Sequence, residues 1–347
     1  MIEWTLEKIR RLTELVCDDA KYSEYRIAEI LTDEFGFTVS RDAVHNTISR
    51  LNLRKLLDKK ITDIMPYFTK YAEIIKGTGV PKELDISTAD SFVSIDSEKL
   101  KLLHISDLHI PFQVDEQVQE ATNKHAGADV VVVNELLDCY SLSRFGKFIN
   151  VPFEIEIDNG IRVIEYLSEN FPIVILFSGN HDKRIRRESF KGVPSSLLFL
   201  VEDDIISQLA KPFSNVYVID APFVQINDAV FIHAEMFSRI DLKAGVNAYQ
   251  YLREWQDVFK LPSFKVITQA HTHMVGATYR AGEIKIMESG CLCRIPDYAV
   301  DKCYTKPQTN GYVVINQTDG VTDFNSSREF VFPSQPYIKN WTPVAWS

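Results

Sequence analysis

Hydrophobic positions along the chain follow two different spacings. Over residues 1–60 apolar residues recur every three or four positions, as with Ile27 and Leu31, and this spacing predicts amphipathic helices. Gly36 interrupts the pattern, and Ser40 is placed to cap a second helix. Two short helices joined by a glycine-containing turn are typical of a helix-turn-helix, so this part is predicted to be a small all-α domain.

After residue 99 the spacing changes, and short apolar runs alternate with helix-like stretches. Eight runs are predicted to be strands: LKLLHIS, DVVVV, IVILFS, VYVID, AVFIHA, KVITQA, EIKIMES and GYVVIN. Helical patterns over 157–170 and 245–260 lie between some of them. This alternation predicts an α/β sheet domain over residues 99–330.

Two further segments have neither pattern. Residues 61–98 begin with a helical pattern and then become polar and rich in turn residues, so we interpret them as a connector. Residues 331–347 contain three prolines and two tryptophans, and we expect them to form a C-terminal tail along the surface.

Composition narrows the functional classes only slightly. The 347 residues include 45% hydrophobic and 25% charged residues, which is ordinary for globular proteins. A formal net charge of −10 argues against a protein that binds nucleic acid over its whole surface, although a local basic face is compatible with it. Five cysteines without paired zinc spacing favour free thiols in a reducing compartment. Without a signal core or a run of ~20 apolar residues, we predict a cytoplasmic protein with no membrane span.

Side chains typical of metal ligands follow five of the predicted strands. They are Asp107 and His109 in DLH, Glu135 and Asp138 in NELLD, Asn180, His181 and Asp182 in GNHD, His233, and His271 and His273 in HTH. Five of the eight histidines fall in these blocks, and we interpret the other three, His45, His104 and His125, as ordinary. Ligands bind outside the carboxyl ends of strands in open α/β sheets, so we expect the blocks to meet there.

The ligand types indicate the metal chemistry. Carboxylate, imidazole and amide oxygen together suit manganese, iron or zinc better than magnesium or calcium alone. Six or seven such ligands exceed what one catalytic ion needs, and two ions ~3.5–4 Å apart form a clamp for phosphoryl displacement. We therefore predict two divalent metal ions, with manganese as the first choice and iron, zinc or nickel as alternatives.

The order of these blocks resembles the calcineurin-like metallophosphoesterase superfamily over roughly residues 101–315. The resemblance implies a four-layer αββα sandwich of two facing sheets, here preceded by the small helical domain. It also implies a two-metal site that hydrolyses a phosphomonoester or phosphodiester by attack of a metal-bound hydroxide.

The resemblance further implies a role for each matching residue. One metal would take Asp107, His109 and His273, the other would take Asn180, His233 and His271, and Glu135 would bridge them. His181 would contact the phosphate and protonate the leaving oxygen as a general acid, Asp182 would orient His181, and Asp138 would support the site from behind. NELLD departs from the family pattern G-D-x-x-D, because Glu135 replaces the bridging aspartate and Asn134 replaces the glycine.

Several of these residues have simpler interpretations. Glu135 can be a helix-start carboxylate in a site that has lost activity, and Asp138 can be a helix cap. Lys183 and Arg184 begin the basic run KRIRR and, with Arg144, are candidates to bind substrate phosphate. A solvated helix face explains such a run equally well.

Basic residues also gather at the end of the helical domain. From residue 41 to 60 there are six basic and two acidic residues, and Arg41, Arg50, Arg54 and Lys55 are candidate DNA-binding residues. Alternatively, this domain docks on the enzyme or on a partner. The predicted function is a phosphoesterase acting on a phosphate ester, with nucleic acid as a candidate substrate. The alternative is a DNA-binding or scaffold protein with a degenerate phosphoesterase domain. The oligomeric state is left open.

Overall fold

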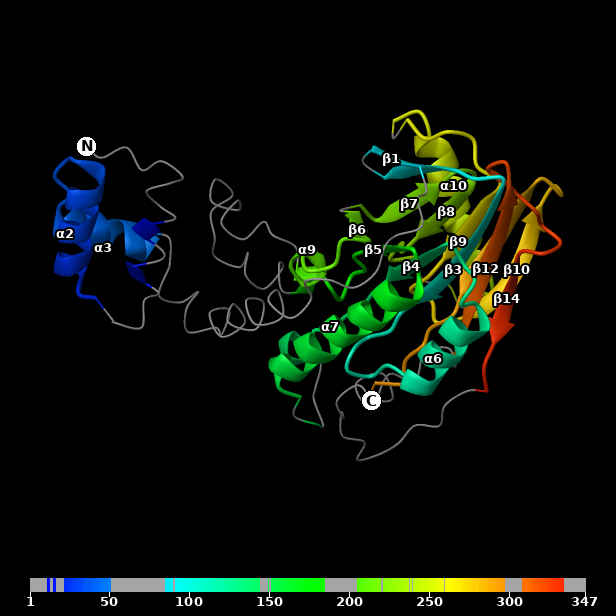
Figure 1. Ribbon diagram of the computed structural model, residues 1–347, viewed down its shortest axis with the longest axis horizontal. Coiled ribbons are helices and arrows are strands. Elements are labelled where there is room, and N and C mark those ends of the chain that lie inside the picture. The colour runs from blue at the N-terminus through cyan, green and yellow to red at the C-terminus, as the bar shows by residue number, and fades with distance from the viewer. Residues whose placement is uncertain are drawn as a thin grey trace. The chain divides into compact units, whose positions relative to one another are not determined.

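The computed structural model describes residues 11–12, 15–16, 22–50, 85–89, 91–143, 149, 151–184, 205–219, 221–236, 238, 240–258, 260–296 and 308–333. The chain divides into two compact units, one with the N-terminal helices and one with the sheets (Figure 1).

The N-terminal unit contains helices α2, Glu24–Phe35, and α3, Arg41–Arg50. The Ser23 hydroxyl caps α2 by accepting from the Arg26 N–H at 3.3 Å, and Gly36 ends it in the left-handed conformation at φ 69°. Ser40 accepts from the Ala43 N–H at 3.2 Å at the start of α3. Both helices therefore lie where the spacing predicted them. Their buried cluster consists of Leu12, Leu15, Ile27, Ala28, Leu31, Val39, Val44 and Ile48.

The larger unit is built on two sheets. The first has the order β13-β12-β3-β4-β5-β6, with β14 also pairing with β12. Its strands are β3 Lys99–Ser106, β4 Val130–Asn134, β5 Ile173–Phe177, β6 Val216–Ile219, β12 Gly311–Thr318, β13 Val321–Thr322 and β14 Arg328–Val331. Strands β3 to β6 run parallel, while β12 runs antiparallel to β3.

The second sheet has the order β1-β2-β7-β8-β9-β11-β10. Its strands are β1 Asp85–Ala89, β2 Phe92–Asp96, β7 Phe223–Ile226, β8 Ala229–Ile232, β9 Val266–Gln269, β10 Val275–Arg280 and β11 Ile284–Ser289. Strands β8, β9 and β11 are parallel neighbours, and the other pairs except β2·β7 are antiparallel.

The two sheets face each other across the main core. Val130 and Val132 of the first sheet share one buried cluster with Phe231 and Met287 of the second. Neighbouring β8 residues such as Val230 point the other way, into a cluster with α10, because successive side chains of a strand alternate between faces. Helices α7, Phe153–Asn170, and α9, Ile205–Ala210, contact β5 and β6, and α10, Lys243–Trp255, contacts β9 and β11. Helix α6, Asp115–Lys124, joins β3 to β4. The architecture is the predicted αββα sandwich (Figure 1).

The predicted boundaries of this domain need correction. Residues 85–96, interpreted as connector, form the hairpin β1–β2, and β2 pairs in parallel with β7. The polar alternation of DISTA and FVSID looked like a turn, but in β2 it belongs to a strand with one buried face, since Val93 and Ile95 are buried. At the other end, β14 extends to Val331, one residue into the predicted tail.

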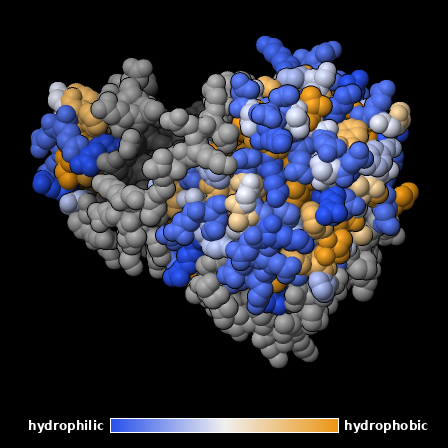
Figure 2. Space-filling view, turned by 45° about the vertical axis from the view of Figure 1, so that its right-hand side comes forward, coloured by the Kyte–Doolittle hydropathy of each residue, from blue (hydrophilic) through white to orange (hydrophobic). Residues whose placement is uncertain are grey.

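Hydrophilic residues predominate on the face shown in Figure 2, with smaller hydrophobic areas among them. None of the helices in the described part of the chain combines the length and apolar character needed to cross a bilayer.

Candidate metal centre

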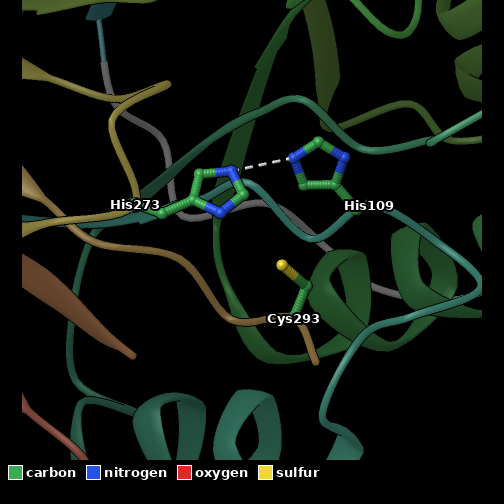
Figure 3. A group of neighbouring side chains, drawn as sticks. All are labelled: His109, His273 and Cys293. Atoms are coloured by element: carbon green, nitrogen blue, oxygen red, sulfur yellow. Dashed lines mark hydrogen bonds between the residues drawn. The ribbon is translucent and has the colours of Figure 1, made fainter. Parts of the chain in front are cut away.

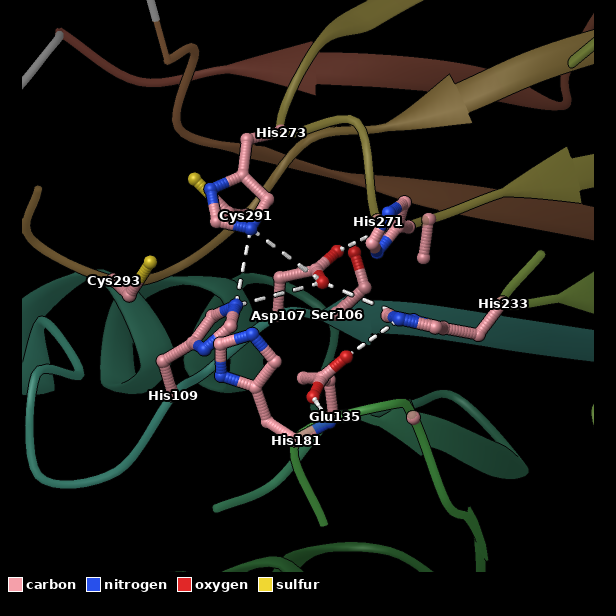
Figure 4. Close-up of polar contacts among 12 residues, drawn as sticks. Ser106, Asp107, His109, Glu135, His181, His233, His271, His273, Cys291 and Cys293 are labelled. Carbon is pink, nitrogen blue, oxygen red and sulfur yellow. Dashed lines mark hydrogen bonds and ion pairs between the residues drawn. The ribbon is translucent and has the colours of Figure 1, made fainter. Parts of the chain in front are cut away.

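The predicted ligands converge because their strands end at neighbouring positions. Asp107 directly follows β3, Glu135 follows β4, Asn180 comes three residues after β5, His233 follows β8, and His271 and His273 follow β9. Strands β3, β4 and β5 are parallel neighbours in one sheet, and β8 and β9 are parallel neighbours in the other. Figure 4 shows the labelled side chains pointing toward one another from both sheets.

Backbone conformation marks the site independently of side-chain type. Five of the seven predicted ligands are in the left-handed region, with φ of 52° at Asp107, 45° at His109, 53° at Glu135, 72° at His271 and 54° at His273. Such a conformation costs about 1–3 kcal/mol for a non-glycine residue and persists only where the surrounding structure enforces it. Strain concentrated in this way is a feature of functional sites.

Asp107 lies at the centre of the first group of ligands. Its carboxylate is fully buried, and one oxygen, Oδ2, accepts from the His271 N–H at 3.0 Å. The other oxygen, Oδ1, lies 3.6 Å from His273 Nε2 and 3.8 Å from both His109 Nε2 and His233 Nδ1. Among the described residues it has no hydrogen-bond partner. Burial raises the pKa of Asp107, but the close approach and charge of His273 and the charges of the other histidines outweigh it, so the pKa is lowered.

Glu135 belongs to two groups of ligand atoms. Its carboxylate lies with Asp107 and His109 in one group and with His233 and His271 in another, with all ligand atoms of each group within 4.8 Å of one another. Its Oε2 is 2.5 Å from His233 Nε2, which in turn lies 3.0 Å from Asn180 Oδ1. A position shared by both groups is what a bridging carboxylate requires.

The longer glutamate is accommodated by the GNHD loop. Glu135 Oε2 accepts from the Asn180 N–H at 3.2 Å, and Oε1 accepts from the His181 N–H. A Cβ atom at Gly179 would lie 2.2 Å from Glu135 Oε2, so the glycine is required where the carboxylate crosses this loop. No α-helix begins at Glu135; a single 3₁₀ turn, Tyr140–Leu142, follows NELLD, and the helix-start interpretation does not hold.

Asp138 orients His181, and this corrects the role predicted for Asp182. His181 Nδ1 donates to Asp138 Oδ1 at 2.5 Å, while the Asp182 carboxylate accepts from the N–H groups of Leu137 at 2.7 Å and Gly179 at 2.9 Å. Asp182 thus connects the NELLD and GNHD loops. The reason is local geometry: Asp182 lies next to His181 in the same turn, so its side chain points back to the backbone of these loops.

Arg184 completes this arrangement. Its Nη1 donates to Asp138 Oδ1 at 2.9 Å, and its Nη2 lies 2.9 Å from His181 Nε2. Because Nδ1 of His181 is the donor to Asp138, Nε2 is the acceptor facing Arg184. The other predicted phosphate contact, Lys183, lies in the adjoining turn, and Arg144 is outside the described residues.

The candidate DNA-binding residues are only partly described. Arg41 lies 3.7 Å from a carboxylate oxygen of Glu24 and over the ring of Tyr25, within the helical unit. Arg50 ends α3 but its side chain is outside the description, as are Arg54 and Lys55 entirely. DNA binding stays a prediction.

His104, interpreted from sequence as ordinary, belongs to a buried chain of hydrogen bonds that ends at the metal centre. Thr268 Oγ1 lies 2.8 Å from His104 Nδ1, and His104 Nε2 lies 2.9 Å from Asn134 Oδ1. Asn134 Nδ2 then lies 2.6 Å from His233 Nδ1, and His233 Nε2 faces Glu135. Burial lowers the pKa of His104 to about 4, which keeps it neutral, with one ring nitrogen donating and the other accepting. A histidine and an asparagine inside otherwise apolar strands were the available sequence signal.

These donors fit divalent metal ions. A buried carboxylate oxygen without a hydrogen-bond partner, facing three imidazole nitrogens, has positive charge as its natural complement. His109 Nε2 and His273 Nε2 lie 3.0 Å apart. This is close to the distance between two nitrogens that both bind the same ion at about 2.0–2.1 Å. The second group adds carboxylate, amide oxygen and imidazole donors.

No family model and no curated protein matches the chain. Among solved structures, it is similar to a single mutant of Vps29 from Entamoeba histolytica at 11% identity and a TM-score of 0.35, covering 67% of this chain and 100% of the other. It is also similar to vacuolar protein sorting 29 of Cryptosporidium parvum at 15% identity and a TM-score of 0.33, covering 68% and 99%. It is similar as well to a predicted phosphoesterase from Streptococcus pneumoniae, at 15% identity and a TM-score of 0.29, covering 67% of this chain and 98% of the other.

Proposed function

We propose that the protein is a metal-dependent phosphoesterase that hydrolyses a phosphomonoester or phosphodiester at the ends of β3, β4, β5, β8 and β9. The observation that carries the proposal is the paired ligand groups, which share Glu135 and include the buried Asp107 oxygen among three histidines. The first ion would be held by Asp107, His109 and His273. The second would be held by Asn180, His233 and His271, with Glu135 between them.

The chain's own side chains would position the substrate and supply the proton for its leaving group. Two bound ions would supply positive charge for the phosphate oxygens and lower the pKa of a water molecule. His181 is held by Asp138 through Nδ1, so its Nε2 is the atom directed toward the leaving oxygen. We expect Nε2, which accepts from Arg184 in the free protein, to take up a proton from solvent and pass it to the leaving oxygen.

Arg184 has two roles in this proposal. Without substrate its Nη2 faces His181 Nε2 and its Nη1 binds Asp138, which holds the imidazole in place. With substrate, the Nη2 N–H groups turn to a phosphate oxygen, because a guanidinium binds phosphate better than an uncharged imidazole nitrogen. This movement frees Nε2 for proton transfer.

A hydrolysis screen with monoester and diester substrates, including DNA, tests the proposal. Chelator-treated protein should be inactive, and one of manganese, magnesium, zinc or nickel should restore turnover. Asn180→Ala serves as the control, since it removes one ligand and leaves the fold largely intact. If no metal and no substrate gives activity above this control, the proposal is wrong. Purified protein that holds no metal would favour the scaffold alternative.

Nucleic acid as the substrate is a further part of the proposal, supported by the basic end of α3 and the residues after it. Full-length protein should bind duplex DNA more weakly as salt rises, and neutralising Arg50, Arg54 and Lys55 should flatten that salt dependence. Unchanged affinity in this variant would assign the helical unit to docking instead.

A further inference from the structure

Two cysteines lie beside the metal centre on a segment that the mechanism does not use. The segment after β11 carries Cys291 and Cys293, and both are buried. The Leu292 N–H between them donates to the Ser106 carbonyl at 3.1 Å, at the end of β3. The segment is therefore fixed against the same strand end that presents Asp107.

Cys293 joins two of the proposed ligands of the first ion. Its sulfur and one ring nitrogen each of His109 and His273 all lie within 4.8 Å of one another. Figure 3 shows the Cys293 side chain pointing toward the two imidazoles from a separate segment of the chain. The backbone holds this position, because the Cys293 carbonyl accepts from Gln308 and, at 3.1 Å, from Asn310 Nδ2.

Cys291 is engaged differently, although it lies nearby. Its sulfur has the Thr309 carbonyl at 3.8 Å and Asn310 Oδ1 at 4.0 Å as acceptors, and it also contacts His273. The choice between the two cysteines is geometric. Among the described residues, the sulfur grouped with both His109 and His273 is that of Cys293.

We infer that Cys293 is a sulfur ligand of the ion held by Asp107, His109 and His273, and that this makes the position selective for zinc over manganese. The inference rests on the metal centre of the proposed function. On binding, the S–H bond breaks, a sulfur–zinc bond forms, and the proton is released to solvent. With the bridging Glu135, this position offers two carboxylate oxygens, two imidazole nitrogens and one sulfur, and each of these is a donor type that zinc binds. Manganese prefers oxygen donors, so the sulfur discriminates against it.

The ligands of the second ion differ from those of the first in their donor atoms. Glu135, Asn180, His233 and His271 offer oxygen and nitrogen only, which suits manganese, iron or zinc. The two positions are then chemically distinct, and a mixed pair of metals follows when both ions are supplied.

X-ray absorption of wild-type protein loaded with two equivalents of zinc tests the ligand directly. We expect a zinc–sulfur shell at about 2.3 Å, equivalent to one sulfur per two zinc ions, beside oxygen and nitrogen at about 2.0–2.1 Å. Cys293→Ser should remove the sulfur shell, and the matched control Cys291→Ser should keep it. Absence of the shell in wild type, or its persistence in Cys293→Ser, would overturn the assignment.

Competition between zinc and manganese provides a second readout. In wild-type protein one of the two positions should retain zinc against excess manganese, and Cys293→Ser should lower that preference at least about tenfold. Circular dichroism of both variants verifies that they fold. If the wild-type protein binds zinc without a sulfur ligand, Cys293 only packs in the core. The inference then fails, while the phosphoesterase proposal stands. If wild type binds no stoichiometric metal, the proposed function fails as well.

Discussion

The two halves of the metal centre differ in how well the protein satisfies their donors before any ion binds. In the half centred on Asp107, a buried carboxylate oxygen has no hydrogen-bond partner among the described residues and faces three imidazole nitrogens at 3.6 to 3.8 Å. In the half centred on Glu135, both carboxylate oxygens accept N–H groups, and Oε2 lies 2.5 Å from His233 Nε2.

This difference predicts an order of affinity. An ion entering the Asp107 half removes the cost of an unsatisfied buried acceptor, which is about 1–3 kcal/mol. An ion entering the Glu135 half must replace the contact between Glu135 and His233, whose pKa is raised by that carboxylate despite the opposing effect of burial. We therefore expect the Asp107 half to bind its ion more tightly, and the second ion to leave first on titration with a chelator.

Replacing Asp107 should have the largest effect. Asp107→Asn keeps the shape of the side chain but removes the charge among the three histidines, so both ions should bind poorly and turnover should fall roughly 10³-fold or more. Metal content by mass spectrometry and hydrolysis rates measure this. A variant that keeps one tightly bound ion would show that the Glu135 half binds without the Asp107 charge, and this would contradict the expected loss of both ions.

His181→Ala should separate turnover from metal binding in both halves. The imidazole contacts Asp138 and Arg184, and it is not among the proposed ligands, so bound metal should stay near two ions per chain. Loss of the general acid should lower kcat by about 10²–10⁴-fold, with a smaller loss for substrates that have a very good leaving group. Release of an ion from this variant would instead make His181 a ligand.

Shortening Glu135 tests whether its half is adapted to glutamate. Glu135→Asp restores the residue of the family pattern, but the shorter side chain cannot reach the N–H groups of Asn180 and His181 from the same backbone position. We expect the second ion to bind more weakly and activity to fall by about 10–100-fold. Glu135→Ala should lose that ion entirely. Higher activity of Glu135→Asp would mean that the glutamate is a defect in a decaying site.

The smallest effect should come from the buried hydrogen-bond chain. Asn134→Ala removes the hydrogen-bond partner of His233 Nδ1, so the imidazole loses its fixed orientation in the Glu135 half only. The second ion should bind up to about tenfold more weakly, while the first should be unchanged. His45→Ala, in the N-terminal unit, is the matched control. Equal weakening of both ions would show that the chain stabilises the fold as a whole.

The sequence by itself determined much of the sandwich and the identity of the ligands. Runs such as VVVV and VILF form β4 and β5 because a strand buried on both faces has no polar position, and the spacing of helices between them requires parallel pairing. The ligand blocks could be located for the same reason, since each block follows an apolar run within a few residues. Local signals also sufficed for Gly36 at the end of α2 and Ser40 at the start of α3.

Only the tertiary structure decided which side chains meet within those blocks. Asp182 adjoins His181 in sequence and was predicted to orient it, yet the folded loops give that contact to Asp138, which lies 43 residues earlier. His104 reaches His233 through Asn134, and Cys293 reaches His109 and His273, across separations that no periodicity encodes. The hairpin β1–β2 likewise becomes part of a sheet only by pairing with β7. Periodicity reports which face of an element is buried, whereas contacts depend on how distant elements pack.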